Sequence, residues 1–434
     1  MIPKVLLYNL PPSGGDLFPI SLGYIAASLK AAGVEGAVAE IDVVTKRTGR
    51  EIADFVARYK PSIVGFSVYQ ANIEFALQLA NLVKTVDPGI VVVFGGPQVT
   101  FMPKEALRQM SDVDVLIRGE GEIVFPSLVK CLFQNTDPAR VKGIVFMRDD
   151  QAIETPSGPL IKDLDDLPSP YAEGVFDLHQ HKGAAMLTSR GCSFNCAFCY
   201  TPRAFRRTIR AHSPRRVLSD MSICVKAGIK RFFFADPSFT YNKERAMAIM
   251  LGIIRRHWKI EIWCETRVDL IDPPLLTLMA KAGVTHIAYG LESADPVVNK
   301  ILRKPINLPH FERIVRFTQS VGIEAEVFTL YGLPGQSKES CLKTLDFLKR
   351  LGIKIIGNSA GQQLHLFFGT DIDDDPERYG IYCFKKRLPL YLSRGADFVT
   401  ECMSRRDIVE VSESYAALHP RNTGGKKGVC ISLV

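Results

Sequence analysis

The sequence predicts an α/β protein in which a doubly wound parallel sheet is followed by a partial (β/α)6 barrel. Short apolar runs alternate with helical patterns along residues 1–141 and again along residues 184–370, and this alternation is typical of parallel sheets. Residues 142–183 are rich in Asp and Pro and have no sustained period, so we expect a linker there. Residues 371–434 are then a small C-terminal region.

The first domain repeats a strand followed by a helix. We expect strands at residues 5–8, 37–43, 63–67, 90–94 and 115–118, and helices at 21–32, 49–59, 75–86, 103–109 and 123–133. Ligands of doubly wound sheets bind beyond the carboxyl ends of the strands. Four successive ends here carry glycines, which let a backbone approach a bulky ligand. Tight turns alone explain any single one of them, but the set of four favours a ligand site.

The second domain contains six further strand-helix units. We expect strands at residues 186–189, 231–234, 261–265, 286–289, 324–330 and 355–357, and helices at 215–227, 243–257, 273–282, 295–302, 309–321 and 338–351. Six such units predict a barrel or partial barrel. Its reactive face is expected at the carboxyl ends of the strands.

Composition limits the class of protein. The chain has 434 residues, of which 47% are hydrophobic and 23% charged, as in folded proteins. Lys and Arg are scattered, so the net charge of +8 gives only a weak indication of an anionic ligand and does not predict nucleic-acid binding. No apolar run reaches about 18 residues without a charge, and no cleavable signal is seen. We expect a cytoplasmic monomer without a membrane span.

Three of the ten cysteines are clustered. Cys192, Cys196 and Cys199 follow the first strand of the second domain, in a loop at the expected reactive face. Thiolates bind iron-sulfur clusters. Three of them can hold three irons of a [4Fe-4S] cluster and leave the fourth iron open to an external ligand.

Two other interpretations of these cysteines fit less well. An ordinary electron carrier needs a fourth cysteine nearby, and none follows before Cys224. A zinc site takes four ligands in paired spacing, and His179, His181 and His212 fall outside such a pairing. The seven remaining cysteines are solitary and are interpreted as small buried or surface thiols.

The CxxxCxxC pattern with an aromatic residue before its last cysteine resembles the radical S-adenosylmethionine (SAM) superfamily. The resemblance covers residues 186 to about 371. It implies that Cys192, Cys196 and Cys199 are both metal ligands and catalytic, and that SAM binds the open iron. Reductive cleavage of SAM then gives a 5'-deoxyadenosyl radical that abstracts a hydrogen atom. An external electron donor such as flavodoxin or ferredoxin is implied.

The same resemblance implies the residues that bind SAM. Asp236 would take the ammonium group and Arg267 the carboxylate, and each ends a predicted strand. The complete set around SAM is Phe198, Tyr200, Asp236, Arg267, Glu292, Ser293, Phe328 and Leu366. For each polar member an ion pair that ties strand ends together is the alternative.

The first domain resembles the cobalamin-binding domain that precedes the radical SAM barrel in one large subclass, and it is therefore expected to be Rossmann-like. The matching segments are residues 19–27, 61–67, 94–97 and 118–122. The implied cobalamin contacts are Pro11, Pro12, Leu22, Ser67, Tyr69, Gly95, Gly96, Pro97, Gly119 and Glu120. Some relatives keep this domain without binding the cofactor.

One feature departs from many cobalamin proteins. The DxHxxG pattern that supplies a histidine to cobalt is absent, and no histidine precedes His179. The resemblance therefore implies base-off cobalamin without a protein imidazole, with the loop of residues 67–70 facing the lower side of the corrin.

The chain thus resembles cobalamin-dependent radical SAM methyltransferases of class B. Such an enzyme moves a methyl group from methylcobalamin to an unactivated carbon of a substrate, here expected to be a small molecule or peptide. Cyclisation and rearrangement use the same cofactors and stay open. A tRNA methylthiotransferase is disfavoured because only Cys131 precedes the motif. A non-enzymatic sensor is disfavoured by the full set of SAM-facing strand ends.

Substrate contacts are expected at the mouth of the TIM-type barrel. Glu326, Tyr331 and His365 are the candidates, because they lie at or near the ends of late strands. Each of them also suits a scaffold role.

Overall fold

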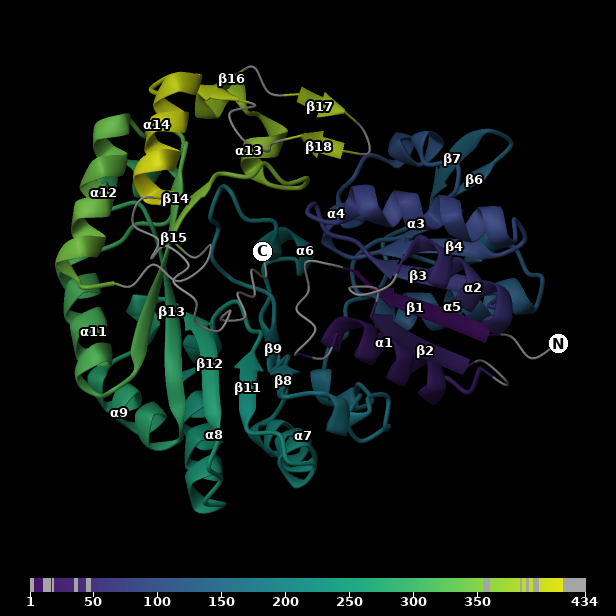
Figure 1. The fold of residues 1–434 in the computed structure, drawn as a ribbon, viewed down its shortest axis with the longest axis horizontal. Helices are drawn as coiled ribbons and strands as arrows, with labels where there is room; N and C mark the ends of the chain where they lie inside the picture. The colour runs from purple at the N-terminus through teal and green to yellow at the C-terminus, as the bar shows by residue number, and fades with distance from the viewer. Residues whose placement is uncertain are drawn as a thin grey trace. The chain divides into compact units, whose positions relative to one another are not determined.

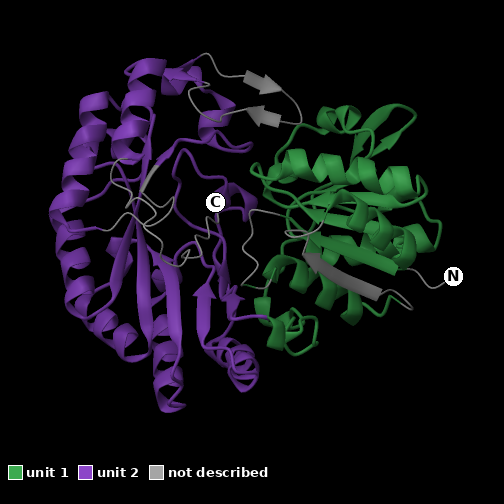
Figure 2. Ribbon diagram, viewed as in Figure 1, with its two compact units in different colours: residues 1–180, 387–391 green, residues 181–386, 392–434 purple. Residues whose placement is uncertain are grey.

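The protein divides into two compact units, coloured separately in Figure 2: residues 1–180 with 387–391, and residues 181–386 with 392–434. The structure is a computed structural model. It describes residues 4–10, 17, 19–34, 38–43, 48–353, 360–382, 385–387, 390–392 and 398–416. No helix among these residues is both long and apolar enough to cross a membrane.

Unit 1 contains the predicted doubly wound sheet (Figure 1). Its strand order is β2-β1-β3-β4-β5-β6-β7, and the first five strands pair in parallel. The strands are β1 (Lys4–Asn9), β2 (Val38–Val43), β3 (Ile63–Ser67), β4 (Val91–Gly95), β5 (Val115–Ile117), β6 (Ile144–Arg148) and β7 (Gln151–Glu154). The helices are α1 (Ile20–Ala31), α2 (Gly49–Tyr59), α3 (Ile73–Val86), α4 (Pro97–Thr100) and α5 (Gly121–Phe133). The expected helix at 103–109 is a 3-10 helix, Lys104–Gln109.

The central strands of this sheet are buried on both faces. All five residues of β3 are buried, as expected for a parallel strand covered by helices. Gly65 in this strand is required by packing, because a Cβ there would lie 2.8 Å from Leu7 Cδ2. The continuous apolar runs therefore determine the central position of β1 and β3.

The segment expected as a linker, residues 142–183, contributes two strands to unit 1. β6 pairs antiparallel with β5, and β7 pairs antiparallel with β6. The two strands are joined at Asp149 and Asp150, whose φ angles are 47° and 60°. Two left-handed residues in a two-residue loop are typical of the hairpin turn of type I′. The Asp-Asp pair was the sequence signal for this hairpin.

Unit 2 contains the predicted partial barrel. Its strand order is β15-β14-β13-β12-β11-β8, and all neighbours pair in parallel. The strands are β8 (Gly183–Met186), β11 (Arg231–Phe234), β12 (Glu261–Thr266), β13 (Val284–Glu292), β14 (Glu324–Tyr331) and β15 (Ala360–Gln363). The expected strand at 355–357 lies outside the described residues.

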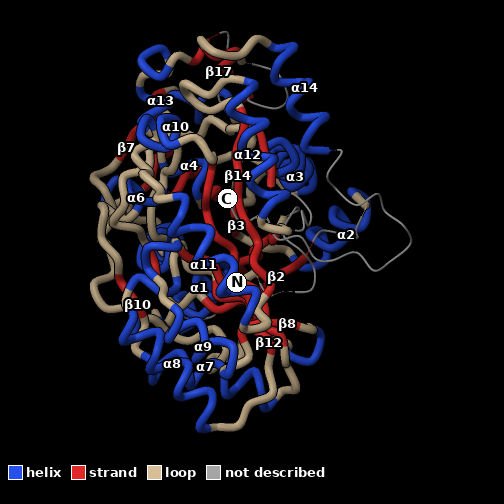
Figure 3. The backbone as a smooth tube through the Cα atoms, turned by 90° about the vertical axis from the view of Figure 1, so that its left-hand side faces the viewer, coloured by secondary structure: helices blue, strands red, loops and turns tan. Residues whose placement is uncertain are grey.

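The barrel helices lie on the outer side of these strands (Figures 1 and 3). They are α7 (Pro214–Lys226), α8 (Lys243–Arg255), α9 (Pro273–Lys281), α10 (Pro296–Ile301), α11 (Leu308–Ser320) and α12 (Lys338–Arg350). Each begins after a Ser, Asn or Asp whose side chain accepts a hydrogen bond from the first turn: Ser213, Asn242, Asp272, Asp295, Asn307 and Ser337. These caps stabilise the first turn of each helix and so define the residue at which the helix begins.

The described part of the C-terminal region contains the helix α14 (Arg405–Ala416), a shorter helix and two small two-stranded sheets. α14 buries Ile408, Val411 and Tyr415 in a core cluster with residues of β14 and α12. The short elements are α13 (Asp371–Asp374), β16 (Ile381–Tyr382), β17 (Lys385–Arg387), β18 (Leu390–Leu392) and β19 (Val399–Thr400). α14 was not predicted, although its buried residues have helical spacing.

Candidate active site

The three clustered cysteines lie in one loop between β9 (Ser189–Arg190) and α6 (Thr201–Ala204). All three are free thiols and half-buried. Burial raises the pKa of each thiol, the thiols oppose one another's ionisation, and Lys304 favours the thiolate form of all three. The loop therefore brings three thiols together beside a cation.

The donor set fits an iron-sulfur cluster. Among the described residues, no three His, Cys, Asp or Glu side chains are grouped to hold a single metal ion. A [4Fe-4S] cluster makes a different demand, because each thiolate binds a different iron. Arg267 also acts electrostatically on Cys192 and Cys196, so two cations offset the charge that three thiolates would bring.

Asp236 follows β11 and accepts hydrogen bonds from the turn between β8 and β9, which precedes the cysteine loop. Its Oδ1 accepts from the backbone N–H groups of Thr188 (2.7 Å) and Ser189 (2.8 Å), and the Thr188 hydroxyl donates to its other oxygen. Burial raises its pKa, although Arg245 and these donors oppose the shift. Asp236 thus joins two strand ends, and its contact with the SAM ammonium group stays a prediction.

Arg267 follows β12 and touches the cysteine loop directly. Its guanidinium carbon lies 3.9 Å from the ring centre of Phe194, between Cys192 and Cys196 in sequence. Two hydrogen bonds of 2.8 and 2.7 Å join it to the half-exposed carboxylate of Asp269. The Nε–Nη2 edge of the guanidinium is therefore engaged by Asp269, and Phe194 fixes the plane of the group.

Glu292 ends β13 and forms a buried ion pair that the sequence did not indicate. Lys304 Nζ lies 2.5 Å from Glu292 Oε1, with side chains only 10% and 7% exposed. Glu292 has a φ of 61°, which is uncommon for a residue other than glycine. A Cβ at Gly290 would lie 2.3 Å from Lys304 Nζ, so glycine is needed to admit the lysine.

The remaining SAM candidates divide into two groups. Ser293 is fully buried, with its hydroxyl 3.4 Å from Thr344 Oγ1 of α12, and Leu366 is 1% exposed. Phe198 and Phe328 are half-buried. Tyr200 contacts Phe367, with ring centres 5.9 Å apart. The three aromatic candidates are thus partly exposed, whereas Ser293 and Leu366 are buried.

Two glutamates lie on the sheet face opposite to the face that α11 covers. Glu265 and Glu326 are in register on either side of Ala288. The indole N–H of Trp263 donates to Glu326 Oε2 at 3.2 Å. Burial, followed by the charge of Glu326, raises the pKa of Glu265 to about 8. Glu265 was not singled out in the sequence.

The other two substrate candidates differ in position. Tyr331 is 7% exposed and stacks on Tyr415 of α14, with ring centres 5.6 Å apart. Its side chain therefore belongs to the core on the outer side of β14. His365 is half-buried, and its ring centre lies 6.2 Å from that of Phe367.

In unit 1 the strand ends are joined by backbone hydrogen bonds. Val68 N–H donates to Gly95 at 2.7 Å, and Gly119 N–H donates to the Thr100 hydroxyl at 3.3 Å. Gly96 has a φ of 104°, and a Cβ there would lie 2.7 Å from the Val68 carbonyl oxygen. Around Gly119 the Cβ position is open. This edge thus presents backbone groups that glycines hold close together at Gly96 and leave uncovered at Gly119.

Some of the predicted cobalamin contacts lie at this edge and others do not. Gly95, Gly96, Pro97 and Gly119 lie at this edge, together with Ser67 and Tyr69. Leu22 is 6% exposed in the core of unit 1. Glu120 Oε2 accepts from the N–H of Ile161 at 2.9 Å, so it holds the segment after β7. Pro11 and Pro12 lie outside the described residues.

Comparison with protein families gives two matches in the same order as the units. Residues 10–129 match the B12 binding domain, and residues 186–348 match the radical SAM superfamily. These matches confirm the predicted succession of a cobalamin-binding domain and a radical SAM barrel.

Individual relatives agree. The chain is 30% identical over 341 residues to an uncharacterized methyltransferase, PH0819, of Pyrococcus horikoshii, covering 77% of this chain and 74% of that protein. It is 29% identical to the anaerobic magnesium-protoporphyrin IX monomethyl ester cyclase of Rubrivivax gelatinosus, covering 76% of this chain and 61% of that protein.

A solved structure shares the fold. The radical SAM methyltransferase TsrM of Kitasatospora setae, with cobalamin and a [4Fe-4S] cluster bound, superposes with a TM-score of 0.73 at 18% identity. The match covers 94% of this chain and 81% of TsrM. The two family matches, the methyltransferase relative and this fold lead to one conclusion: the chain belongs to the cobalamin-dependent radical SAM enzymes.

Proposed function

We propose that the protein is a methyltransferase that moves a methyl group to an unactivated carbon of a small-molecule or peptide substrate. The observation that carries this proposal is the group of three thiols, with its two neighbouring cations, in a barrel that follows a B12 binding domain. When bound, the cluster would supply an electron to SAM, and cobalamin would carry the methyl group.

The residues of unit 2 would have the following binding roles. Cys192, Cys196 and Cys199 would each hold one iron. Arg267 would bind the SAM carboxylate, because Phe194 and Asp269 already orient its guanidinium. Lys304 would hold Glu292 in the position from which it reaches the ribose. Aromatic side chains from the cysteine loop and β14, Phe198, Tyr200 and Phe328, would enclose the adenine.

Cobalamin would lie along the strand ends of unit 1, against Gly95, Gly96, Pro97 and Gly119. The absence of any histidine before His179 supports a base-off state without a protein imidazole. In that state the loop of residues 67–70 would face the lower side of the corrin. The 2.7 Å hydrogen bond from Tyr69 N–H to the Asn72 side chain would fix the shape of this loop.

The substrate would meet Glu326 and His365 on the inner side of the barrel. A small molecule is supported by TsrM, which has been solved with tryptophan as its substrate. The reducing electron would come from a protein such as flavodoxin or ferredoxin. The monomeric state and the cytoplasmic location stay predictions.

Cyclisation is a second candidate, because the cyclase of Rubrivivax gelatinosus is nearly as similar in sequence as the methyltransferase of Pyrococcus. The two functions differ in what they make from SAM. A methyltransferase of this kind converts one SAM to S-adenosylhomocysteine and another to 5'-deoxyadenosine, whereas the radical step alone gives only 5'-deoxyadenosine.

The test uses SAM as the probe. The protein reconstituted with iron, sulfide and cobalamin is incubated with SAM and a strong reductant, and both products are quantified. We expect both from the wild type and no 5'-deoxyadenosine from Cys196→Ala. 5'-Deoxyadenosine without S-adenosylhomocysteine would contradict methyl transfer and support the cyclase alternative.

A further inference from the structure

The cysteine loop is held from two sides at Ala197, which is completely buried. The N–H of Ala197 donates to the carbonyl of Leu302 at 2.9 Å, just after α10. Its carbonyl accepts from the N–H of Ile372 in α13 at 3.2 Å. Since Ala197 stands between Cys196 and Cys199, the backbone that carries the thiols depends on two segments distant in sequence.

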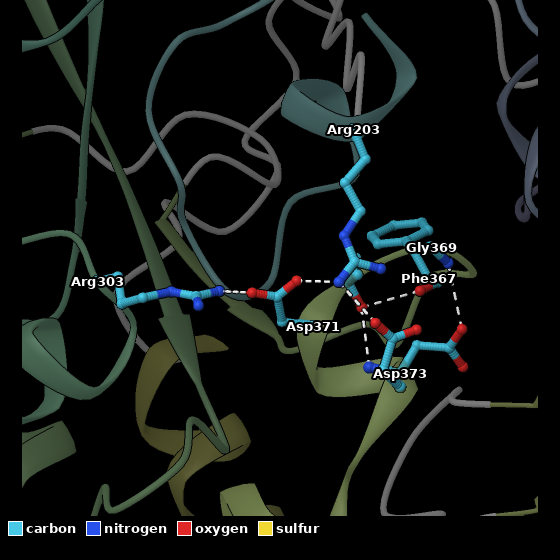
Figure 4. Close-up of polar contacts among 8 residues, drawn as sticks. Arg203, Arg303, Phe367, Gly369, Asp371 and Asp373 are labelled. Carbon is cyan, nitrogen blue, oxygen red and sulfur yellow. Dashed lines mark hydrogen bonds and ion pairs between the residues drawn. The ribbon is translucent and has the colours of Figure 1, made fainter. Parts of the chain in front are cut away.

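Two ion pairs join α13 to the residues that follow α10 and to α6, the helix directly after the cysteine loop. Figure 4 shows the side chains of Arg203 and Arg303 pointing to the carboxylate of Asp371 from opposite sides. Arg203 belongs to α6, directly after the cysteine loop, and also lies 2.6 Å from Asp374. Arg303 follows Leu302. The side chain of Asp371 is 18% exposed, whereas those of Arg203 and Arg303 are 31% and 38% exposed, so this bridge of ion pairs is partly shielded from solvent.

Asp371 is placed by its own local structure. The Thr370 hydroxyl accepts from the N–H of Asp373 at 3.1 Å, and Asp373 in turn accepts from the N–H of Gly369 at 3.2 Å. Thr370 is thus the N-cap of α13, and Asp373 additionally ties the preceding Gly369 to this turn. Asp371 is thus the first residue of a short helical turn that Thr370 caps and that Ile372 joins to the cysteine loop.

Arg303 occupies a strained position between the bridge and the buried ion pair. Its φ is 56°, a conformation that costs about 1 kcal/mol or more for a residue with a side chain. The next residue, Lys304, donates its N–H to Asn299 at 2.8 Å and pairs with Glu292. Strain of this kind persists where the surrounding contacts enforce it, and it concentrates at functional sites.

We propose that Asp371 is a positioning residue for the iron-sulfur cluster: by bridging Arg203 and Arg303 it holds the cysteine loop in the geometry that binds three irons. This inference rests on the proposed cluster site and adds a residue outside the ligand set. Groups that orient metal ligands commonly change metal affinity by about 10-fold to 100-fold when removed.

The test compares three variants in the full chain. Asp371→Asn removes the charge with little change in shape, and Asp371→Glu restores it. Asp375→Asn is the matched control, because Asp375 is exposed and its carboxylate accepts from the nearby N–H of Arg378 at 3.2 Å. The readouts are the rate of iron release to a chelator and the electron paramagnetic resonance spectrum of the reduced cluster.

We expect Asp371→Asn to release iron about 10-fold faster than the wild type and to show an altered spectrum. Asp371→Glu should recover part of both properties, and Asp375→Asn should match the wild type. Equal iron release from Asp371→Asn and the wild type would overturn the inference. So would an equal effect of Asp375→Asn.

A separate measurement excludes simple unfolding. The two tryptophans, Trp258 and Trp263, both belong to unit 2, so the fluorescence of the apo protein in urea reports the barrel. Its midpoint should hardly change in Asp371→Asn. If that variant does not fold, Arg303→Gln removes one of the two ion pairs of Asp371. The rate of iron release from Arg303→Gln then tests the proposal. A wild type that binds no cluster would instead contradict the proposed function.

Discussion

The sheet edges at the carboxyl ends of the strands expose different chemical groups in the two units. In unit 1 the edge consists of backbone groups, with glycines at positions 95, 96 and 119 and hydrogen bonds between neighbouring loops. In unit 2 it consists of charged side chains that are already paired: Asp236 with two backbone N–H groups, Arg267 with Asp269, and Glu292 with Lys304.

This difference matches the ligands that we assign to the two units. A corrin is large, and glycines allow a backbone to lie close to such a ring. SAM and a cluster with three thiolates carry concentrated charge, which requires oriented charged partners. The unit 1 edge should therefore be sensitive to added bulk, and the unit 2 edge to unbalanced charge.

The largest effect is expected from the charged edge. Lys304→Met leaves Glu292 as an unpaired, buried carboxylate, and removal of one partner of a buried pair costs about 3 kcal/mol or more. The free energy of unfolding of unit 2, measured in urea by tryptophan fluorescence, should fall by that amount. The double variant Lys304→Met with Glu292→Gln should recover part of the loss.

Lys338→Met provides the control for this prediction. Lys338 pairs with Glu410, and their side chains are 42% and 34% exposed. Loss of so exposed a pair should cost less than about 1 kcal/mol. Similar losses of unfolding free energy in the two variants would show that the buried pair of Lys304 and Glu292 stabilises unit 2 no more than an exposed pair does.

A smaller effect is expected from the backbone edge. Gly96 has φ 104° and ψ −178°, a region that only glycine occupies readily, at a cost of about 1 to 3 kcal/mol for other residues. Gly96→Ala should weaken cobalamin binding, measured from the absorption spectrum, and leave the tryptophan transition of unit 2 unchanged.

Gly33→Ala tests whether backbone strain alone, at a glycine away from the strand-end edge, affects cobalamin binding. Gly33 also has a positive φ, 58°, but nothing lies within 4 Å of its Cβ position. The substitution should destabilise unit 1 by about 1 kcal/mol with cobalamin binding retained. If both glycine variants lose cobalamin equally, the strand-end edge is not the binding surface.

Features encoded locally could be predicted from the sequence. The cysteine motif spans eight residues, so its spacing alone brings the thiols into one loop. The barrel helices were predicted because their periodic patterns are local, and the structure adds caps such as Ser213 and Asn242 next to them. The doubly wound sheet followed from continuous apolar runs such as β3.

Features that depend on distant partners could not be predicted. Lys304 and Asp371 have no local pattern, and they matter only because folding brings them to Glu292 and to the two arginines. The two N–H groups at Thr188 and Ser189 that donate to Asp236 also come from a segment distant in sequence. Tyr331 alternates to the outer side of β14, where the unpredicted α14 covers it.

The central claim is that one chain binds a cluster in unit 2 and cobalamin in unit 1. The most direct measurement is iron, sulfide and cobalt analysis after anaerobic purification with cobalamin supplied, for the wild type and for Cys196→Ala. We predict about four irons and about one cobalt per wild-type chain, with the iron lost and the cobalt kept in Cys196→Ala. A wild-type protein without cobalt would contradict the assignment of unit 1, and one without iron would contradict the assignment of unit 2.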